Sequence, residues 1–154
     1  MSLTAWRIIK ARFAASAFDG EGARRFGGRW NSKGTPMVYT AGSQALAVLE
    51  MLVHLEASDL LKYYRLIPVT FDEMMLEAVD RKTLPANWRR RPTPAGIRAI
   101  GDAWAASAES VVLRVPSVIV PAESNFLLNP IHPDYVKLKI GKPQPFRFDV
   151  RLTR

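Results

Sequence analysis

The sequence contains no cysteine and only two histidines among its 154 residues. Without cysteine, disulfide bonds and thiolate metal sites are excluded. His54 and His132 alone are too few for a histidine-based catalytic zinc site, so we expect no metal. No apolar run approaches the roughly 20 residues that a transmembrane helix needs. We therefore expect a protein that works without a metal centre and away from the membrane.

The N-terminus also lacks a targeting pattern. Residues 1–7 contain no basic segment followed by an apolar segment, so they do not resemble a secretory signal. Together with the absence of cysteine, this pattern favours a cytoplasmic location.

Acidic residues are scarce relative to basic ones. The 22 Lys and Arg residues exceed the 14 Asp and Glu residues and give a formal net charge of +8. Such a surface favours an anionic partner, for which nucleic acid, a phosphorylated small molecule and an acidic protein are the candidates. The cluster Arg89, Arg90 and Arg91 is interpreted as a solvated face.

The length and the residue pattern predict one α+β domain. Hydrophobic residues make up 48% and charged residues 23% of the chain, which is the ordinary globular range. Strands outnumber helices, and the order is not a regular βαβ alternation. Strands are expected at residues 6–9, 37–40, 63–71, 111–114, 117–120, 136–140 and 146–149. Helices are expected at residues 43–55 and 94–107. Loops are expected at residues 11–28 and around Asn125 and Asn129.

The run Gly27, Gly28, Arg29, Trp30 and Asn31 predicts an anion-binding turn. Paired glycines let backbone N–H groups approach an anion, and the arginine fork suits phosphate or carboxylate. The run is not a nucleotide phosphate loop, because it lacks both that glycine spacing and the Gly-Lys-Ser/Thr ending. An arginine after an ordinary surface turn is the alternative interpretation.

Glu50 is the only charged residue in the apolar stretch 42–53. A helix that is apolar nearly all round is usually buried, and a buried carboxylate is costly unless a cation or hydrogen-bond donors meet it. A functional carboxylate, a structural ion pair and an exposed glutamate on a narrow polar edge all remain open at this point. His54 follows one helical turn later and is given little weight.

Two further positions are candidates for polar contacts. Tyr39 lies in the strand before the Glu50 helix, and Ser117 begins an apolar segment. Ser117 is not expected to be a nucleophile, because no nucleophile-elbow pattern surrounds it. Trp30 is an aromatic residue that fits either a stacking surface or the core, and the core is favoured.

Taken in order, these motifs resemble the RES-domain toxins of bacterial Xre–RES toxin–antitoxin pairs. The arginine, glutamate and serine that name the domain match Arg29, Glu50 and Ser117. The other matching segments are Trp6-Arg7, the glycine run, Tyr39, residues 45–50, Leu84-Pro85 with Trp88, residues 101–104, residues 114–117, and residues 125–133. The resemblance therefore covers essentially the whole chain and implies a single RES domain over residues 1–154.

The resemblance implies a fold similar to that of ADP-ribosyltransferases, with two small split sheets around an NAD cleft and flanking helices. Members of the family cleave NAD as a substrate rather than a recycled cofactor. Several use inorganic phosphate as co-substrate and release nicotinamide and ADP-ribose 1″-phosphate, while others are described as ADP-ribosylating a protein. The implied partner is a helix-turn-helix antitoxin of the Xre type, which blocks the active site, and a homodimer within that complex is allowed for.

The resemblance also suggests roles for individual residues. Breaking the ribose–nicotinamide bond develops an oxocarbenium-like cation, which the Glu50 carboxylate would stabilise. Arg29, with Arg7, would hold the pyrophosphate or the acceptor phosphate. The remaining expected contacts are Tyr39 near the nicotinamide ribose, Ser117 on the nicotinamide amide or ribose, and Trp30 and Asn125 as weaker substrate contacts.

Two alternatives stay open. An ADP-ribosyltransferase with a protein acceptor needs the same cleft, so the sequence hardly separates it from a NAD-degrading enzyme. A basic nucleic-acid-binding module without catalysis would account for the charge, but no nucleic-acid-binding motif supports it, and direct binding of nucleic acid is not expected.

Overall fold

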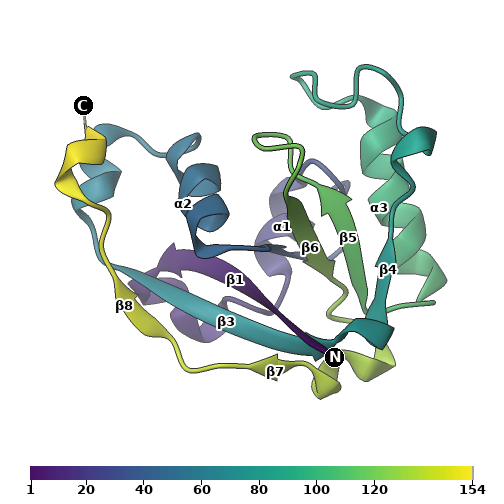
Figure 1. Cartoon of the computed structure of the whole chain (residues 1–154), viewed down its shortest axis with the longest axis horizontal. Coiled ribbons are helices and arrows are strands. Elements are labelled where there is room, and N and C mark those ends of the chain that lie inside the picture. The colour runs from purple at the N-terminus through teal and green to yellow at the C-terminus, as the bar shows by residue number, and fades with distance from the viewer. Residues whose placement is uncertain (154) are drawn as a thin grey trace.

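The computed structural model, which describes residues 1–153, forms one curled sheet of eight strands (Figure 1). The strand order is β4-β5-β6-β2-β1-β3-β7, and β8 pairs with β3. The strands are β1 (Ser2–Lys10), β2 (Val38–Ala41), β3 (Tyr64–Asp72), β4 (Leu76–Ala78), β5 (Val112–Pro116), β6 (Ser124–Leu128), β7 (Lys139–Ile140) and β8 (Gln144–Phe146). All pairs are antiparallel except β4 with β5.

The sheet consists of two halves. Nine paired residues join β1 to β3, and β7 and β8 extend that half. The other half contains β4, β5, β6 and β2. The two halves meet at a single register pair between β1 and β2, Trp6 with Ala41. The predicted α+β class is therefore confirmed, and the two small sheets that were expected are joined into one curled sheet.

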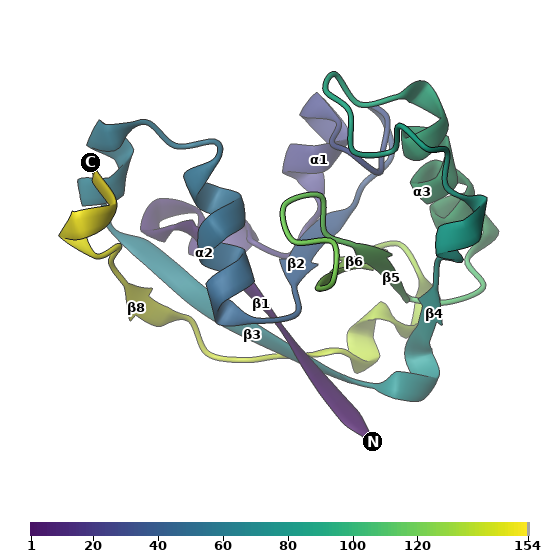
Figure 2. The same ribbon diagram turned by 45° about the horizontal axis from the view of Figure 1, so that its top comes forward.

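Three α-helices accompany the sheet: α1 (Glu21–Phe26), α2 (Gln44–Leu52) and α3 (Ala95–Ser107). Figure 2 shows α2 and α3 on opposite sides of the molecule, with the β5–β6 loop between them. Short 3-10 helices occupy Ala11–Ser16, Ala57–Leu61, Glu73–Met75, Arg81–Thr83, Pro133–Lys137 and Val150–Thr153. None of the helices among residues 1–153 has the length and hydropathy needed to cross a bilayer.

Each long helix packs on one half of the sheet. The Ser43 side chain caps α2 by accepting the Leu46 N–H, as the sequence predicted. On α2, Leu46 and Ala47 are buried in a cluster with Tyr64 of β3. On α3, Ile97 and Trp104 are buried against the β5–β6 side. These two hydrophobic clusters hold α2 and α3 in place, one on each side of the space between the two helices.

The expectation that α2 is buried all round is wrong. Only Leu46 and Ala47 are buried in this helix, while Leu49 is 41% exposed and Val53, which follows the helix, is 51% exposed. The helix lies at an edge of the molecule, so it has one buried face and one open face. Glu50 can therefore be partly buried and still reach a solvent-connected space.

The expected strand at residues 117–120 and the expected loop at Asn125 are both wrong. Residues 117–120 form a turn, and the strand that pairs with β5 is β6, which contains Asn125. The reason is local hydrogen bonding. The Ser117 hydroxyl accepts the N–H groups of Ile119 and Val120, both at 3.1 Å, which gives the backbone an alternative to extended structure.

Other boundaries also differ from the prediction. Of the residues expected as a strand at 136–140, Val136 and Lys137 end a 3-10 helix, and only β7 is extended. The strand expected at 146–149 ends at Phe146. The loop expected at 11–28 contains α1 and a 3-10 helix. These are short elements, whose sequence patterns are too brief to set their limits.

Candidate active site

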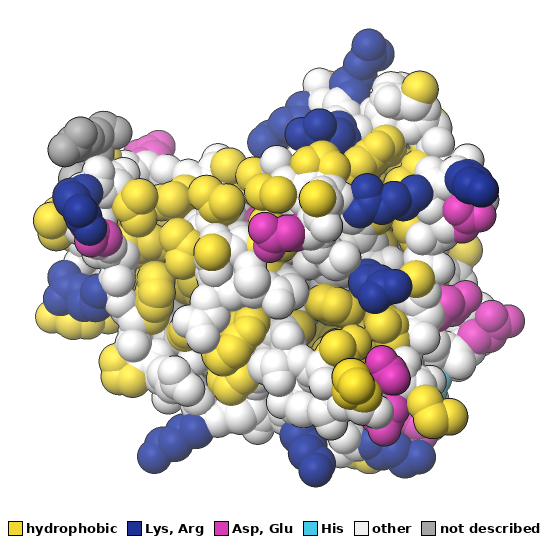
Figure 3. All heavy atoms as spheres, in the orientation of Figure 1, with side chains coloured by type: hydrophobic (Ala, Val, Ile, Leu, Met, Phe, Trp, Pro, Cys, Tyr) yellow, Lys and Arg dark blue, Asp and Glu magenta, His cyan; other side chains and the backbone are white. Residues whose placement is uncertain are grey.

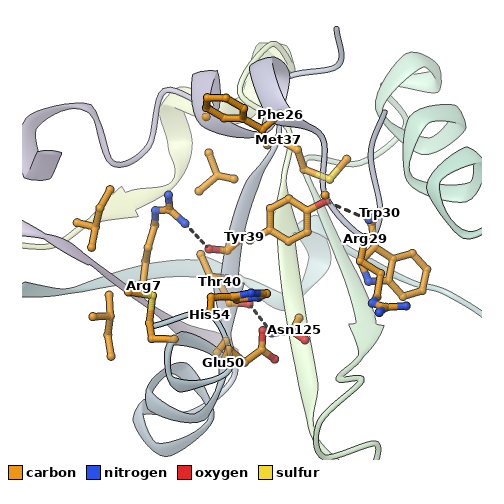
Figure 4. Close-up of a pocket in the computed structure, with 18 of the residues that line it drawn as sticks. Arg7, Phe26, Arg29, Trp30, Met37, Tyr39, Thr40, Glu50, His54 and Asn125 are labelled. Atoms are coloured by element: carbon orange, nitrogen blue, oxygen red, sulfur yellow. Dashed lines mark hydrogen bonds between the residues drawn. The ribbon is translucent and has the colours of Figure 1, made fainter. Parts of the chain in front are cut away.

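A cleft of about 1040 Å³ opens between the two halves of the sheet. It is lined by β1, α1, the glycine turn, β2, α2 and the β5–β6 loop, and Figure 4 shows its central residues. Of the residues selected from sequence, the cleft lining includes Arg7, Arg29, Trp30, Tyr39, Glu50 and Asn125. Ser117 lies behind the lining. The structure therefore brings together in space residues that the sequence separates widely.

A tight turn presents Arg29. The Gly28 N–H donates to the Asn31 carbonyl at 3.0 Å, so the chain reverses between these residues. A Cβ added to Gly28 would lie 2.6 Å from the Tyr39 hydroxyl oxygen, too close for any other residue type. The second glycine of the motif is thus required by the packing of Tyr39 against the turn.

Asn31 holds this turn from inside and is a residue that the sequence analysis did not select. Its side chain is fully buried and donates to the carbonyls of Ala23 at 2.8 Å and Thr35 at 3.0 Å. Its Oδ1 accepts the Tyr39 hydroxyl at 2.5 Å. The signal in the sequence that could have identified Asn31 is its place directly after the Gly-Gly-Arg-Trp run.

Tyr39 joins β2 to the turn. Its hydroxyl donates to Asn31 and accepts the Trp30 N–H at 3.1 Å. Burial raises the pKa of Tyr39 far above its ordinary value, so the hydroxyl stays protonated at neutral pH. The ring, rather than the hydroxyl, remains available to a ligand in the cleft (Figure 4).

Trp30 is part of the core. Its side chain is 2% exposed and packs in the cluster of Ile97 and Trp104. Gly101 of α3 packs directly on the Trp30 carbonyl oxygen, and Asp102 accepts the Ser32 N–H at 2.8 Å. The substrate contact expected of the Trp30 ring is not supported by this geometry, because its faces are covered by protein.

Arg29 lies on the wall of the cleft with free hydrogen-bonding capacity. One amino group, Nη1, donates to the Trp88 carbonyl at 3.1 Å and the Arg90 carbonyl at 3.4 Å. Among residues 1–153, no carboxylate lies within salt-bridge distance of this guanidinium. Burial, and then the neighbouring Arg91, lower the pKa of Arg29. The Arg29 guanidinium is therefore held in place by two carbonyl groups, while no salt bridge neutralises it within the described residues. Both properties are those of an arginine that binds an anion.

Arg7 is a second unpaired guanidinium. Its Nη1 donates to the Tyr39 carbonyl at 3.0 Å, while its Nε is buried without a hydrogen-bond partner in the described chain. Burial is the main cause that lowers the pKa of Arg7. No carboxylate in the described chain forms a salt bridge with Arg7, although Asp19 is near enough to raise its pKa. A buried cation without a close counter-charge is costly, and an anionic ligand in the cleft would offset that cost.

Glu50 faces the cleft from α2. Burial raises the pKa of Glu50, and hydrogen bonds from Asn125 and Ser117 lower it by less. His54 and Arg29 also favour its charged form. No Lys or Arg side chain among residues 1–153 forms a salt bridge with Glu50, so the structural ion pair left open from sequence is absent.

Ser117 forms a hydrogen bond with the Glu50 carboxylate and does not itself line the cleft. The side chain is fully buried, and its hydroxyl donates to Glu50 Oε1 at 3.2 Å. The contact with nicotinamide or ribose expected from sequence is therefore not favoured, because the hydroxyl is already engaged and does not line the cleft. Asn125 lies nearer the ligand space, and its amide donates to the Thr40 carbonyl at 3.2 Å.

Comparison with known proteins shows the family to which the chain belongs. The family model for the RES domain matches residues 4–149. The chain belongs to the RES domain family. A protein of Yersinia enterocolitica named Toxin Res is 40% identical over 148 residues, covering 96% of this chain and 97% of that protein.

Two other relatives extend the comparison. A protein of Sphingobium named Prs ADP-ribosylating toxin is 38% identical over 159 residues and covers 100% of this chain and 99% of its own length. A chain in the crystal structure of the Mycobacterium tuberculosis MbcT–MbcA toxin–antitoxin complex has a TM-score of 0.78 and 22% identity, with 96% of this chain and 85% of that chain covered. That last likeness supports the fold of this RES domain.

The RES domain structure also adds cleft residues that sequence reasoning missed. Arg91, which was interpreted as part of a solvated face, lines the cleft with Thr93. Phe26 of α1 lines it too and is 77% exposed (Figure 4). Nothing in the spacing of the arginine triplet distinguishes Arg91 from Arg89 and Arg90, so only the fold could select it.

Proposed function

We propose that this RES-domain protein is the toxin of a toxin–antitoxin pair and that it degrades NAD. The observation that carries the proposal is the Glu50 carboxylate, which faces a cleft containing two arginines, Arg7 and Arg29, that form no salt bridge within residues 1–153. NAD offers a diphosphate for the arginines and a ribose whose bond to nicotinamide breaks with the development of positive charge. The relatives named as toxins support the same conclusion.

The proposed reaction depends on an ionised carboxylate and does not require a proton donor. When the bond between ribose C1″ and the nicotinamide nitrogen breaks, the electron pair moves to the pyridinium ring, which leaves as neutral nicotinamide. No proton is required for that departure, and the charge appears on the ribose as an oxocarbenium-like cation. An ionised Glu50 beside the ribose would stabilise this cation and bind a ribose hydroxyl.

The other residues position the substrate around Glu50. In Figure 4, Arg7 and Arg29 lie on either side of the Tyr39 ring. The ring provides a flat surface near the ribose, and Asn125 supplies an amide beside Glu50. Ser117 orients the carboxylate through its hydroxyl and has no direct role with NAD.

Inorganic phosphate is the proposed acceptor. Attack of a phosphate oxygen on C1″ forms a C–O bond as the C–N bond breaks, which gives ADP-ribose 1″-phosphate. A protein acceptor is the second candidate, and the 38% identity to the relative named Prs ADP-ribosylating toxin favours it. The same cleft serves both acceptors.

The proposed partner is an antitoxin with a helix-turn-helix region of the Xre type. The match to a chain of a toxin–antitoxin complex supports a protein partner of this kind. The exposed apolar side chains Leu49, Val53 and Phe26 near the cleft, and the net charge of +8, are surface features that a partner with an apolar and acidic segment would complement.

The test is incubation of the purified protein with NAD, with and without inorganic phosphate, while nicotinamide and the ribosyl product are quantified. Glu50→Gln and Arg29→Ala should lose at least about 100-fold of the activity, because each removes a charge that acts on the transition state. Glu109→Gln removes an exposed carboxylate outside the cleft and is the matched control.

The outcomes separate the candidates. Phosphate-dependent nicotinamide release without a protein acceptor supports phosphorolysis and rules out an obligate protein transferase. Release that requires a protein and labels it supports the transferase. Intact NAD under all conditions, together with salt-dependent binding of DNA or RNA that Arg89, Arg90 and Arg91 control, would leave the nucleic-acid-binding alternative.

A further inference from the structure

We infer that Arg91 joins Arg29 to form a phosphate-binding subsite on one wall of the cleft. The inference rests on the proposed function, because it assigns a place to one of the phosphate groups of that reaction. Arg91 comes from the loop between the 3-10 helix Arg81–Thr83 and α3, 62 residues after Arg29 in sequence.

The loop that carries Arg91 is fastened on both sides of the cleft. Arg29 Nη1 donates to the carbonyls of Trp88 and Arg90, so the loop backbone touches the glycine turn. Arg89 Nε donates to the Val118 carbonyl at 2.9 Å, so the same loop also touches the β5–β6 turn. These attachments, at the three residues that precede Arg91, restrict the backbone of the loop, and Arg91 borders the cleft.

The two guanidinium groups lie near each other, and Glu50 favours the charged form of Arg29 without forming a salt bridge with it. Arg91 is close enough to lower the pKa of Arg29 by repulsion. None of the salt bridges formed within residues 1–153 involves Arg29 or Arg91. Bringing two like charges to one wall is unfavourable, and a bound anion converts the repulsion into two attractions. The pair is therefore arranged for a ligand and not for the stability of the free protein.

Phosphate fits this pair best. Each guanidinium presents a planar fork of donors that can bind two phosphate oxygens, and two forks match a dianion. Thr93 borders the same part of the cleft and adds a hydroxyl. Figure 3 shows Lys and Arg side chains gathered at the top of the molecule, where the loop of residues 84–94 lies in Figure 1. The positive electrostatic potential of these side chains also attracts anions towards the mouth of the cleft.

The subsite is separate from Arg7. Arg7 reaches the cleft from β1 and lies on the other side of the Tyr39 ring (Figure 4). The cleft thus has Arg7 on one wall, Arg29 and Arg91 on another, and the Glu50 carboxylate between them. This arrangement suits a reaction between two phosphate-bearing molecules, NAD and inorganic phosphate. The phosphate at Arg29 and Arg91 has two sources, the free inorganic ion and the diphosphate of NAD, and the experiment separates them.

The test compares Arg91→Ala with Arg90→Ala. Arg90 is the matched control because it lies in the same loop with the same charge but does not line the cleft, and its contact with Arg29 uses only the backbone. Binding of inorganic phosphate and of ADP-ribose is measured by calorimetry, and KM for NAD and for phosphate is measured in the cleavage assay. Arg91→Ala should weaken one of these ligands about 10- to 100-fold, while Arg90→Ala stays within about threefold of the wild type.

A loss confined to inorganic phosphate places the free ion at this subsite, and a loss confined to ADP-ribose places the diphosphate there. Arg91→Lys should recover part of the loss, because it restores the charge without the fork. Equal behaviour of Arg91→Ala and Arg90→Ala in an active protein overturns the inference and leaves the proposed function standing. A wild type that leaves NAD intact but binds phosphate through Arg91 refutes the proposed function alone, and one that binds neither ligand overturns both.

Discussion

The Ser117 hydroxyl donates a hydrogen bond to Glu50 Oε1 at 3.2 Å across 67 residues of sequence. The serine is fully buried, and the same hydroxyl accepts the N–H groups of Ile119 and Val120. One side chain therefore shapes the β5–β6 turn and fixes the carboxylate of α2. The serine and the glutamate of the RES motif act as a unit, in which only the glutamate faces the cleft.

Replacing this serine should change both stability and the titration of Glu50. Ser117→Ala leaves two part-buried N–H groups without their partner, which costs about 1–3 kcal/mol in the free energy of unfolding. It also removes a hydrogen bond that lowers the pKa of Glu50, so the acid limb of the NAD-cleavage profile should move to higher pH. Denaturant unfolding and the pH dependence of nicotinamide release measure the two effects.

Ser58→Ala is the control, because Ser58 is exposed and forms no side-chain hydrogen bond in the described chain. A purely structural role for Ser117 would reduce stability and leave the acid limb in place. An unmoved acid limb in Ser117→Ala would thus contradict the positioning role.

The raised pKa of Glu50 predicts how stability depends on pH. Because its pKa is higher in the folded than in the unfolded chain, the folded state binds the proton more tightly. The resulting stabilisation is present below the unfolded pKa and is lost as pH rises through the folded pKa. Glu50→Gln should therefore melt at the same or a higher temperature than the wild type at neutral pH, and this advantage should shrink below the unfolded pKa.

The control for this experiment is Glu109→Gln, at an exposed position. Melting curves at several pH values compare both variants with the wild type. A Glu50→Gln protein that is markedly less stable at neutral pH would mean that the carboxylate is a structural anchor, and the functional assignment of Glu50 would lose its support.

The sequence predicted those elements whose signals are local. Ser43 before an apolar helix located the start of α2, and Pro94 before a run with helical spacing located the start of α3. The Gly-Gly-Arg-Trp-Asn run correctly indicated a turn, because two adjacent glycines have few other uses. The α+β class followed from the order of such elements.

Features that depend on particular side-chain hydrogen bonds or on tertiary packing were missed. Ser117 begins an apolar segment with the composition of a strand, and only its side-chain bonds to the following N–H groups turn that segment into a loop. Arg91 was misjudged, whereas Trp30 occupies the core position that was favoured for it. The Trp30 ring is covered by α3, while Arg91 is carried into the cleft by a loop attached to Arg29 and Val118.

The packing of Gly28 gives a third prediction. In Gly28→Ala the new Cβ would lie 2.6 Å from the Tyr39 hydroxyl and 2.9 Å from Asn31 Oδ1, so their hydrogen bond has to break or the turn has to move. Overpacking of this kind costs about 1–3 kcal/mol and should also displace Arg29 and weaken NAD binding. Thermal unfolding and KM for NAD measure these effects.

Gly96→Ala is the matched control, since a Cβ at Gly96 in the first turn of α3 meets nothing within 4 Å. Alanine favours a helix over glycine by about 1 kcal/mol, so this variant should be as stable as the wild type or more stable. If both variants gave the same stability and the same KM, the close approach of Tyr39 to the turn would be refuted.

Tyr39 links the cleft to the turn through its hydroxyl, and this link can be removed without changing the ring. Tyr39→Phe leaves the fully buried Asn31 Oδ1 and the Trp30 N–H without their partner, at a cost of about 1–3 kcal/mol in the free energy of unfolding. KM for NAD should rise because the turn that presents Arg29 is loosened. Since the phenylalanine ring still faces the cleft, kcat should change less than KM.

Tyr63→Phe provides the comparison, because Tyr63 is 66% exposed and its ring keeps its contact with the Arg147 guanidinium after loss of the hydroxyl. Its stability should stay within about 0.5 kcal/mol of the wild type, as for most surface substitutions. If Tyr39→Phe lost kcat and kept KM, its hydroxyl would act on the reacting ribose itself, and the turn-holding role would be wrong. A rise in KM with lower stability would instead identify Tyr39 as the residue through which β2 holds Arg29 in place.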